Sequence, residues 1–245
     1  LDLGKVRDVM EGLRCQDYDL NRVEVLLVGS ADLCEAWRCL ADCPSPFAAI
    51  RTIAAAGEHY YALKNLGAVE AQGSILAMLD SDVVPLPGWL RALTHGIEQG
   101  AEVTCGPSLF RTVEAADSMR SANRLTHQVA ASISWAFILG EQGRATGFLS
   151  HNLAMRKRTF DRLRYRTDYG RTCAGSILAD DLLQDGIVPC FLPAQRVAHA
   201  FDWTWWCSRL HVRFGHEVYL LHRMSTQSVS QRAKHLGPLD CIATP

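Results

Sequence analysis

The sequence lacks a strong excess of either charge and lacks a long apolar run. It carries 25 Lys and Arg against 26 Asp and Glu, a formal net charge of −1. A surface that binds nucleic acid needs a basic excess, so the balance argues against such a partner. The apolar stretch nearest in length to a spanning helix, Val129–Leu139, falls short of the roughly 18 residues required. No secretory signal is recognisable, but the chain begins at Leu1 without a methionine, so we expect it to be part of a longer one.

The sequence also lacks the cysteine pattern of a secreted or zinc-binding domain. Its nine cysteines are an odd number scattered through apolar stretches, and their spacing does not form the paired Cys-x-x-Cys of a zinc site. This favours reduced thiols and a cytoplasmic location, with the cytoplasmic face of a membrane as an alternative. With 48% hydrophobic and 21% charged residues, the 245-residue chain predicts a globular protein with a substantial core, most simply a single domain.

What the sequence does have is an apolar run that ends abruptly in two acids. Ser74–Leu79 is long enough for one buried strand and is followed at once by Asp80-Ser81-Asp82. Ligands of open α/β sheets bind just beyond the carboxyl ends of the strands, and buried carboxylates need a compensating cation. Carboxylate oxygens suit Mg²⁺ or Mn²⁺, so a metal site is one interpretation. The alternative is that Asp82 caps a helix beginning near Pro87.

The rest of the chain alternates helical and strand-like patterns. Three- and four-residue apolar spacing predicts helices, and short apolar runs predict strands. The first half is predicted to form a helix over Leu3–Leu13, strands over Val23–Val28 and Phe47–Thr52, a helix over Glu58–Ala71, the Ser74–Leu79 strand, a helix from Trp89 to about Gly100 and a strand over Ala101–Cys105. The second half is predicted to form a long helical stretch from Val113 to about Leu139, strands over Phe148–Met155 and Ile187–Leu192, and an aromatic-rich helix over Phe201–Met224. This alternation predicts an α/β fold with a mostly parallel sheet flanked by helices.

Six landmarks fall in the order seen in family 2 glycosyltransferases, and the sequence therefore resembles that family, whose members have the GT-A fold. The landmarks are Leu13–Tyr18, Glu24–Val28, Ala62–Ala68 with its Lys-Asn-Leu-Gly, Leu79–Asp82 with Pro87–Leu90, Phe148–Arg156 with Asn152, and Gly186–His199. The resemblance implies a single GT-A-like domain over residues 1–245, with a nucleotide-sugar half at about 1–106 and an acceptor half at about 107–245.

The resemblance further implies an enzyme that transfers a sugar from a nucleotide-sugar, with UDP-sugars favoured, to a glycan, lipid or small-molecule acceptor. Asp82 would hold Mn²⁺ or Mg²⁺ against the diphosphate, with Asp80 directed at the metal or the ribose. His199 would be a further metal ligand or a diphosphate contact, unless it is structural. Asn152 would help to bind the donor.

Two other residues could bind a ligand or could have no role beyond the helix that carries or follows them. Asp32 follows the predicted strand Val23–Val28 and would lie near the base or ribose, or else cap the next helix. Lys64 would reach a phosphate, or else be a solvated helix lysine.

The catalytic base is where the sequence departs from the family. Inverting members carry an acidic pair about a dozen residues before the glycine matched by Gly186, and that count lands on Ala174-Gly175. The nearest acidic pair is Asp180-Asp181. Either a helical turn is deleted and Asp181 deprotonates the acceptor, or the pair is a solvated helix face. The family's first strand would also precede Leu1.

Two further alternatives concern the aromatic segment and the function as a whole. Phe201–Trp206 is either an acceptor platform or peripheral membrane contact, or a core helix. A sugar-1-phosphate nucleotidyltransferase would need a glycine-rich loop near the first strand. A degenerate domain that binds a nucleotide-sugar or a protein without turnover is favoured by the displaced acidic pair and disfavoured by the intact Asp80-Ser81-Asp82.

Overall fold

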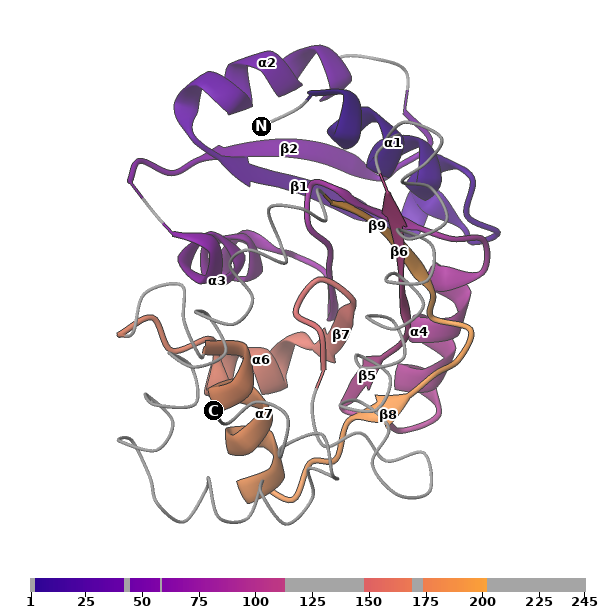
Figure 1. Ribbon diagram of the computed structural model, residues 1–245, viewed down its shortest axis with the longest axis vertical. Coiled ribbons are helices and arrows are strands. Elements are labelled where there is room, and N and C mark those ends of the chain that lie inside the picture. The colour runs from indigo at the N-terminus through magenta and orange to yellow at the C-terminus, as the bar shows by residue number, and fades with distance from the viewer. Residues whose placement is uncertain (1–2, 42–44, 58, 113–147, 169–173, 202–245) are drawn as a thin grey trace, which may run out of the picture.

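The computed structural model describes residues 3–41, 45–57, 59–112, 148–168 and 174–201 (Figure 1). The predicted long helix near 113–139 and the aromatic segment from Asp202 onward lie outside these residues. Within them, helices and strands alternate along the chain as the sequence predicts. No helix of the described part is both long enough and apolar enough to cross a membrane.

The first part of the chain forms a parallel strand pair between helices. β1 (Glu24–Gly29) pairs with β2 (Ala49–Ala54), with Glu24 opposite Ala49. α2 (Ala31–Ala41) packs on one side of the pair and α3 (Tyr60–Glu70) on the other (Figure 1). α1 (Leu3–Arg14) packs against the strand β4 (Val83–Pro85). The predicted positions of α1, α3 and both strands β1 and β2 are confirmed to within a few residues.

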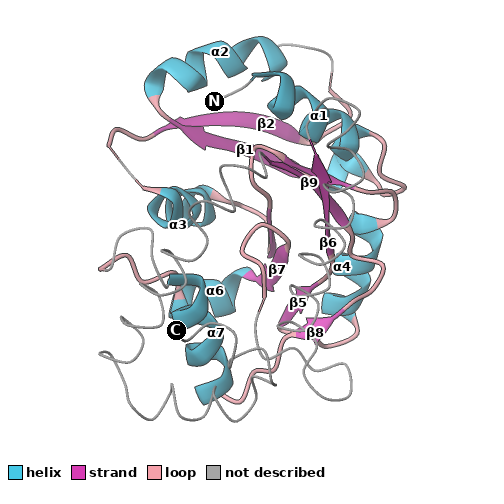
Figure 2. Ribbon diagram, in the orientation of Figure 1, coloured by secondary structure: helices cyan, strands magenta, loops and turns pink. Residues whose placement is uncertain are grey.

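The remaining strands form two further sheets (Figure 2). One has the order β3-β7-β5-β8, made from β3 (Ile75–Met78), β7 (Leu153–Arg156), β5 (Val103–Cys105) and β8 (Cys190–Phe191). The other has the order β4-β9-β6, with β6 (Ser108–Thr112) and β9 (Val197–Phe201). The remaining helices are α4 (Trp89–Glu98), α6 (Lys157–Leu163) and α7 (Ala174–Gln184).

The α/β class is confirmed, but strand pairing is more mixed than the predicted mostly parallel sheet. Among the described strands, β1–β2, β5–β8 and β6–β9 are parallel, whereas β3–β7, β5–β7 and β4–β9 are antiparallel. β7 lies between β3 and β5 and runs antiparallel to both. Phe201 ends strand β9 rather than opening the predicted aromatic helix.

Two apolar clusters hold these elements together. One gathers α1, β1, α2 and α4 around Met10 and Trp89, which are each 1% exposed. The other gathers α3, β3, β5, β7, α6 and α7 around Phe160 and Leu178. Periodic apolar residues such as Val6, Met10 and Leu13 place the buried face of α1 in the first cluster.

The interpretation of Asp82 as a helix cap is wrong. α4 begins at Trp89, and its N-cap is Gly88, whose φ of 84° lies in the left-handed region that glycine adopts without strain. The short strand β4 separates Asp82 from that helix. Asp82 is therefore available for another role at the end of the loop that follows β3.

Candidate functional site

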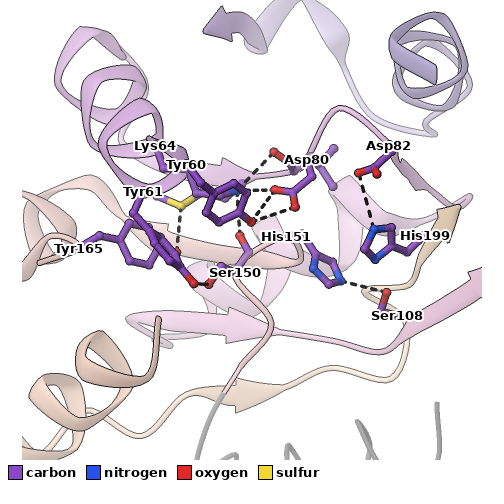
Figure 3. A network of polar contacts seen from close by, with 12 residues as sticks. Tyr60, Tyr61, Lys64, Asp80, Asp82, Ser108, Ser150, His151, Tyr165 and His199 are labelled. Atoms are coloured by element: carbon purple, nitrogen blue, oxygen red, sulfur yellow. Dashed lines mark hydrogen bonds and ion pairs between the residues drawn. The ribbon is translucent and has the colours of Figure 1, made fainter. Parts of the chain in front are cut away.

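The two acids lie on one tight connection between strands. β3 ends at Met78, β4 begins at Val83, and the amide of Val83 donates to the carbonyl of Asp80 at 3.1 Å. The carboxylates point in different directions, Asp80 toward α3 and Asp82 toward β9 (Figure 3). They therefore have different partners.

Asp80 is held by two residues of α3, one helical turn apart. The hydroxyl of Tyr60 donates to Oδ1 at 2.7 Å and to Oδ2 at 2.9 Å. Lys64 Nζ donates to Oδ1 at 2.8 Å, and also to the carbonyls of Ser150 at 3.1 Å and Leu79 at 3.4 Å. The side chains of Lys64 and Asp80 are 10% and 18% exposed, so this ion pair is largely shielded from water.

These contacts keep Asp80 ionised. Burial by itself would raise the pKa of the carboxyl, but the charge of Lys64, the nearby His151 and the hydrogen bonds from Lys64 and Tyr60 outweigh it and lower the pKa to about 2. Burial and the Asp80 carboxylate raise the pKa of Tyr60 well above its ordinary value. At neutral pH Tyr60 is thus a hydroxyl donor and Asp80 an anionic acceptor.

Asp82 faces a histidine from a strand distant in sequence. β9 pairs antiparallel with β4, and Val83 lies opposite His199. This register brings His199 Nε2 to 3.6 Å from Asp82 Oδ1, longer than a hydrogen bond. The side chains are 18% and 30% exposed, so a carboxylate oxygen and an imidazole nitrogen lie side by side and remain accessible.

His151, which sequence reasoning did not select, lies between the two acids (Figure 3). Its Nε2 is 3.0 Å from Ser108 Oγ, and its ring lies 4.7 Å from that of His199, centroid to centroid. Burial and His199 lower the pKa of His151 to about 3, against the attraction of Asp80. Its position directly before Asn152 in the family-like segment was the one available signal.

Asn152, predicted to bind the donor, is fully buried and bonded to the protein itself. Its Nδ2 donates to the carbonyls of Pro107 at 3.1 Å and Gln195 at 2.9 Å, and its Oδ1 accepts from Trp89 Nε1 at 2.9 Å. Both amide hydrogens are used, so the geometry gives Asn152 a structural role. It ties together the segments that carry Ser108, His151 and His199.

For Lys64 and Asp32 the structure contradicts one of the two interpretations that the sequence left open. Lys64 is not a solvated helix lysine, because its side chain is 10% exposed and pairs with Asp80; contact with a phosphate stays a prediction. Asp32 is exposed in the first turn of α2, one residue inside the helix rather than at its cap.

α7 meets the site at its first turn, away from its acidic pair. A Cβ on Gly175 would lie 2.7 Å from Ser150 Oγ and 2.9 Å from the hydroxyl of Tyr61, so the helix start packs against the residues beside Lys64. Asp181 is seven residues from Ala174, about 10 Å along the axis. Asp180 accepts a hydrogen bond from Gln184 at 3.4 Å. The described contacts with Ser150 and Tyr61 are therefore made by the start of α7, and Asp180 and Asp181 lie about two turns further along the helix.

The side chains that could bind a metal here suit an ion that also binds a ligand, rather than an ion held by protein side chains alone. In the part of the chain that the structure describes, no three His, Cys, Asp or Glu side chains are grouped to hold a metal. Mg²⁺ and its relatives commonly take one or two protein ligands and complete their shell with water and phosphate oxygens. Asp82 and His199 fit that requirement, while Asp80 is engaged by Tyr60 and Lys64.

Comparison with known proteins bears on the fold. No protein-family model matches the sequence, and no curated protein matches it either. Among solved structures, the mannosyltransferase PcManGT from Pyrobaculum calidifontis, in complex with GDP-Man and Mn²⁺, is similar with a TM-score of 0.64 and 17% sequence identity. The match covers 91% of this chain, which spans 61% of the length of that protein. The chain therefore has a glycosyltransferase-like fold.

Proposed function

We propose that this protein is a metal-dependent glycosyltransferase that uses a nucleoside diphosphate sugar as donor. The observation that carries the proposal is the pair of acids after β3, with Asp82 facing His199 and Asp80 fixed by Lys64. An accessible carboxylate and imidazole suit a divalent ion, and an anchored anion suits the hydroxyls of a sugar ring. The similarity of fold to a structure that contains GDP-Man and Mn²⁺ supports the same proposal.

Asp82 and His199 would hold Mn²⁺ or Mg²⁺ beside the donor diphosphate. When bound, the ion supplies positive charge where negative charge builds on the leaving diphosphate as the glycosidic bond breaks. Asp80, kept ionised by its surroundings, would accept a hydrogen bond from the ribose. Lys64 acts on the donor through Asp80, because its ammonium group is committed to that carboxylate. Asp32 would contact the base or ribose from the start of α2.

Deprotonation of the acceptor needs a base, which the resemblance to family 2 glycosyltransferases leads us to expect at the start of α7. An inverting reaction needs a base within hydrogen-bond reach of the acceptor hydroxyl. The start of α7, which packs beside Lys64 through Ser150, carries Ala174 and Gly175, and no acid lies in its first turn. We therefore propose that Asp181 is not the base.

Donor binding tests the proposal directly. Purified protein is titrated with UDP-, GDP- and dTDP-sugars with and without Mn²⁺, and hydrolysis of each donor is followed. We expect one donor to bind and to be hydrolysed slowly only with the metal. Both effects should be lost in Asp82→Asn and retained in Asp161→Asn, a surface acid paired with Lys157. The fold of each variant is checked by circular dichroism.

The alternative is a domain that binds a nucleotide-sugar without transferring it. The observation that favours it is the absence of an acid from the first turn of α7. Metal-dependent binding of a donor, with no hydrolysis and no transfer to any acceptor in a panel of glycans, lipid phosphates and small alcohols, would select this alternative. Failure of a folded sample to bind any donor would contradict both.

A further inference from the structure

Tyr60 takes part in the site although no sequence pattern selects it. It is the first residue of α3, and Lys64 lies four residues later on the same face of the helix. Lys64 Nζ lies 4.9 Å from the centroid of the Tyr60 ring, and the Tyr61 ring meets it edge to face at 4.7 Å. The Tyr60 ring is thus confined on two sides, which fixes where its hydroxyl can lie.

The hydroxyl of Tyr60 fixes the Asp80 carboxylate in turn. Its single hydrogen is shared between Oδ1 at 2.7 Å and Oδ2 at 2.9 Å, while Lys64 occupies a second position on Oδ1. A carboxylate offers about four acceptor positions. These bonds therefore fill Oδ1 and leave Oδ2 with capacity for a ligand, in a carboxylate that two donors prevent from rotating.

We propose that Tyr60 is a positioning residue for the ribose of the donor nucleotide, acting through Asp80. It holds the carboxylate so that Oδ2 accepts a hydrogen bond from a ribose hydroxyl. This inference rests on the proposed function and adds a prediction to it. The contribution of Tyr60 to nucleotide affinity should disappear when the ribose hydroxyl is removed from the ligand, because the fixed carboxylate then has no hydroxyl from which to accept a hydrogen bond.

The neighbouring Tyr61 provides a matched control. Its hydroxyl lies 3.4 Å from Ser150 Oγ and its side chain is buried in the core cluster of α3, β3 and α7. Tyr61→Phe and Tyr60→Phe remove the same atom from adjacent residues and keep both rings. Of the two tyrosines, Tyr60 is the one bonded to Asp80 through its hydroxyl.

The experiment measures binding of UDP, GDP and their 2′-deoxy and 3′-deoxy analogues with Mn²⁺, by calorimetry. In the wild type we expect one deoxy analogue to bind about tenfold more weakly than the parent nucleotide, as for loss of one hydrogen bond to a charged group. In Tyr60→Phe the ratio of the affinity for the parent nucleotide to the affinity for that analogue should fall by at least about threefold. In Tyr61→Phe it should stay within about twofold of wild type.

A double-mutant cycle then tests whether Tyr60 acts through Asp80. In Asp80→Asn the preference for the ribonucleotide should be lost, and adding Tyr60→Phe should change it no further. A Tyr60→Phe variant that weakens parent and deoxy nucleotides equally would overturn the inference, as would independent effects in the cycle. Equal affinity of the wild type for the parent nucleotides and their deoxy analogues would overturn the inference and leave the proposed function standing. Binding of neither UDP nor GDP would overturn the inference, and failure to bind dTDP as well would overturn the proposed function.

Discussion

Removal of the Asn152 side chain should destabilise the protein strongly. Asn152→Ala leaves Trp89 Nε1 and the carbonyls of Pro107 and Gln195 without the bonds that Asn152 now makes to them. Each buried polar group left unsatisfied costs about 1–3 kcal/mol, and relaxation or entry of water recovers part of the total. We expect a loss of about 3–5 kcal/mol, a large part of the roughly 5–15 kcal/mol by which a typical domain is stable.

Urea denaturation followed by tryptophan fluorescence measures this loss. Asn65→Ala is the control, because Asn65 is only partly buried and its side chain makes two bonds to the backbone of Tyr165. It should cost about 1–2 kcal/mol. Donor affinity is measured on the folded fraction of Asn152→Ala, where a loss that accompanies the lost stability fits displacement of the segment that carries His199.

Two results would refute the reasoning on Asn152. A loss below about 1 kcal/mol would mean that the buried groups find other partners. Normal stability combined with lost donor affinity would return Asn152 to the donor-binding role implied by the resemblance to family 2 glycosyltransferases.

Three further predictions concern pH, the acid on α7 and a close backbone contact. His151 has a pKa of about 3 in the fold against about 6.5 in the unfolded chain. As the pH falls, the unfolded chain therefore binds a proton on His151 before the folded chain does, and the free energy of unfolding should decrease below about pH 6.5. Metal-free protein should be about 2 kcal/mol less stable at pH 5 than at pH 7 in urea denaturation, and His151→Phe should lessen this difference. Asp181→Asn should keep most of the transfer or hydrolysis rate that Asp82→Asn loses; an equally large loss would assign the base to Asp181. Gly106→Ala should lower the melting temperature markedly, because its Cβ would lie 2.0 Å from the carbonyl oxygen of Gln195; an unchanged melting temperature would contradict this.

The longer elements could be predicted from the sequence because their signals are local. Apolar spacing in α1 and the apolar run of β1 report burial of one face or of a whole strand, and both appear where expected. The start of α4 at Trp89 follows Gly88, which takes a left-handed conformation. These features depend on residues within a turn or two of one another.

The short strand β4 beside the site could not be predicted in the same way. It has three residues, too few for a periodic signal, whereas β5 and β8 lie within the predicted strands Ala101–Cys105 and Ile187–Leu192. β4 exists because a partner far along the chain, β9, completes it. The proximity of Asp82 and His199 follows from that pairing, so the sequence indicated both residues but not their contact.

The roles of the site residues depend in the same way on distant partners. Asp80 and Asp82 look equivalent in the sequence, yet α3 places two donors on the first, and β9 places an imidazole beside the second. Asn152 lies in a family-like motif, but its surroundings are the carbonyls of two other loops. The motifs therefore selected the candidate residues, while burial and hydrogen bonding set the partners of each one.

The start of α7 combines a count along the sequence with a position in space. Counting back from Gly186 located the expected acid at Ala174-Gly175, and the structure places Gly175 against Ser150 and Tyr61, next to the Lys64–Asp80 pair. This position therefore carries a glycine where the resemblance to family 2 glycosyltransferases leads us to expect an acid. A glycine there lets the helix approach more closely than any other residue allows, since even a Cβ would lie under 3 Å from two hydroxyl oxygens. A carboxylate could not be placed at Gly175 without moving Ser150 or Tyr61, so the glycine and the close packing of α7 belong to one arrangement.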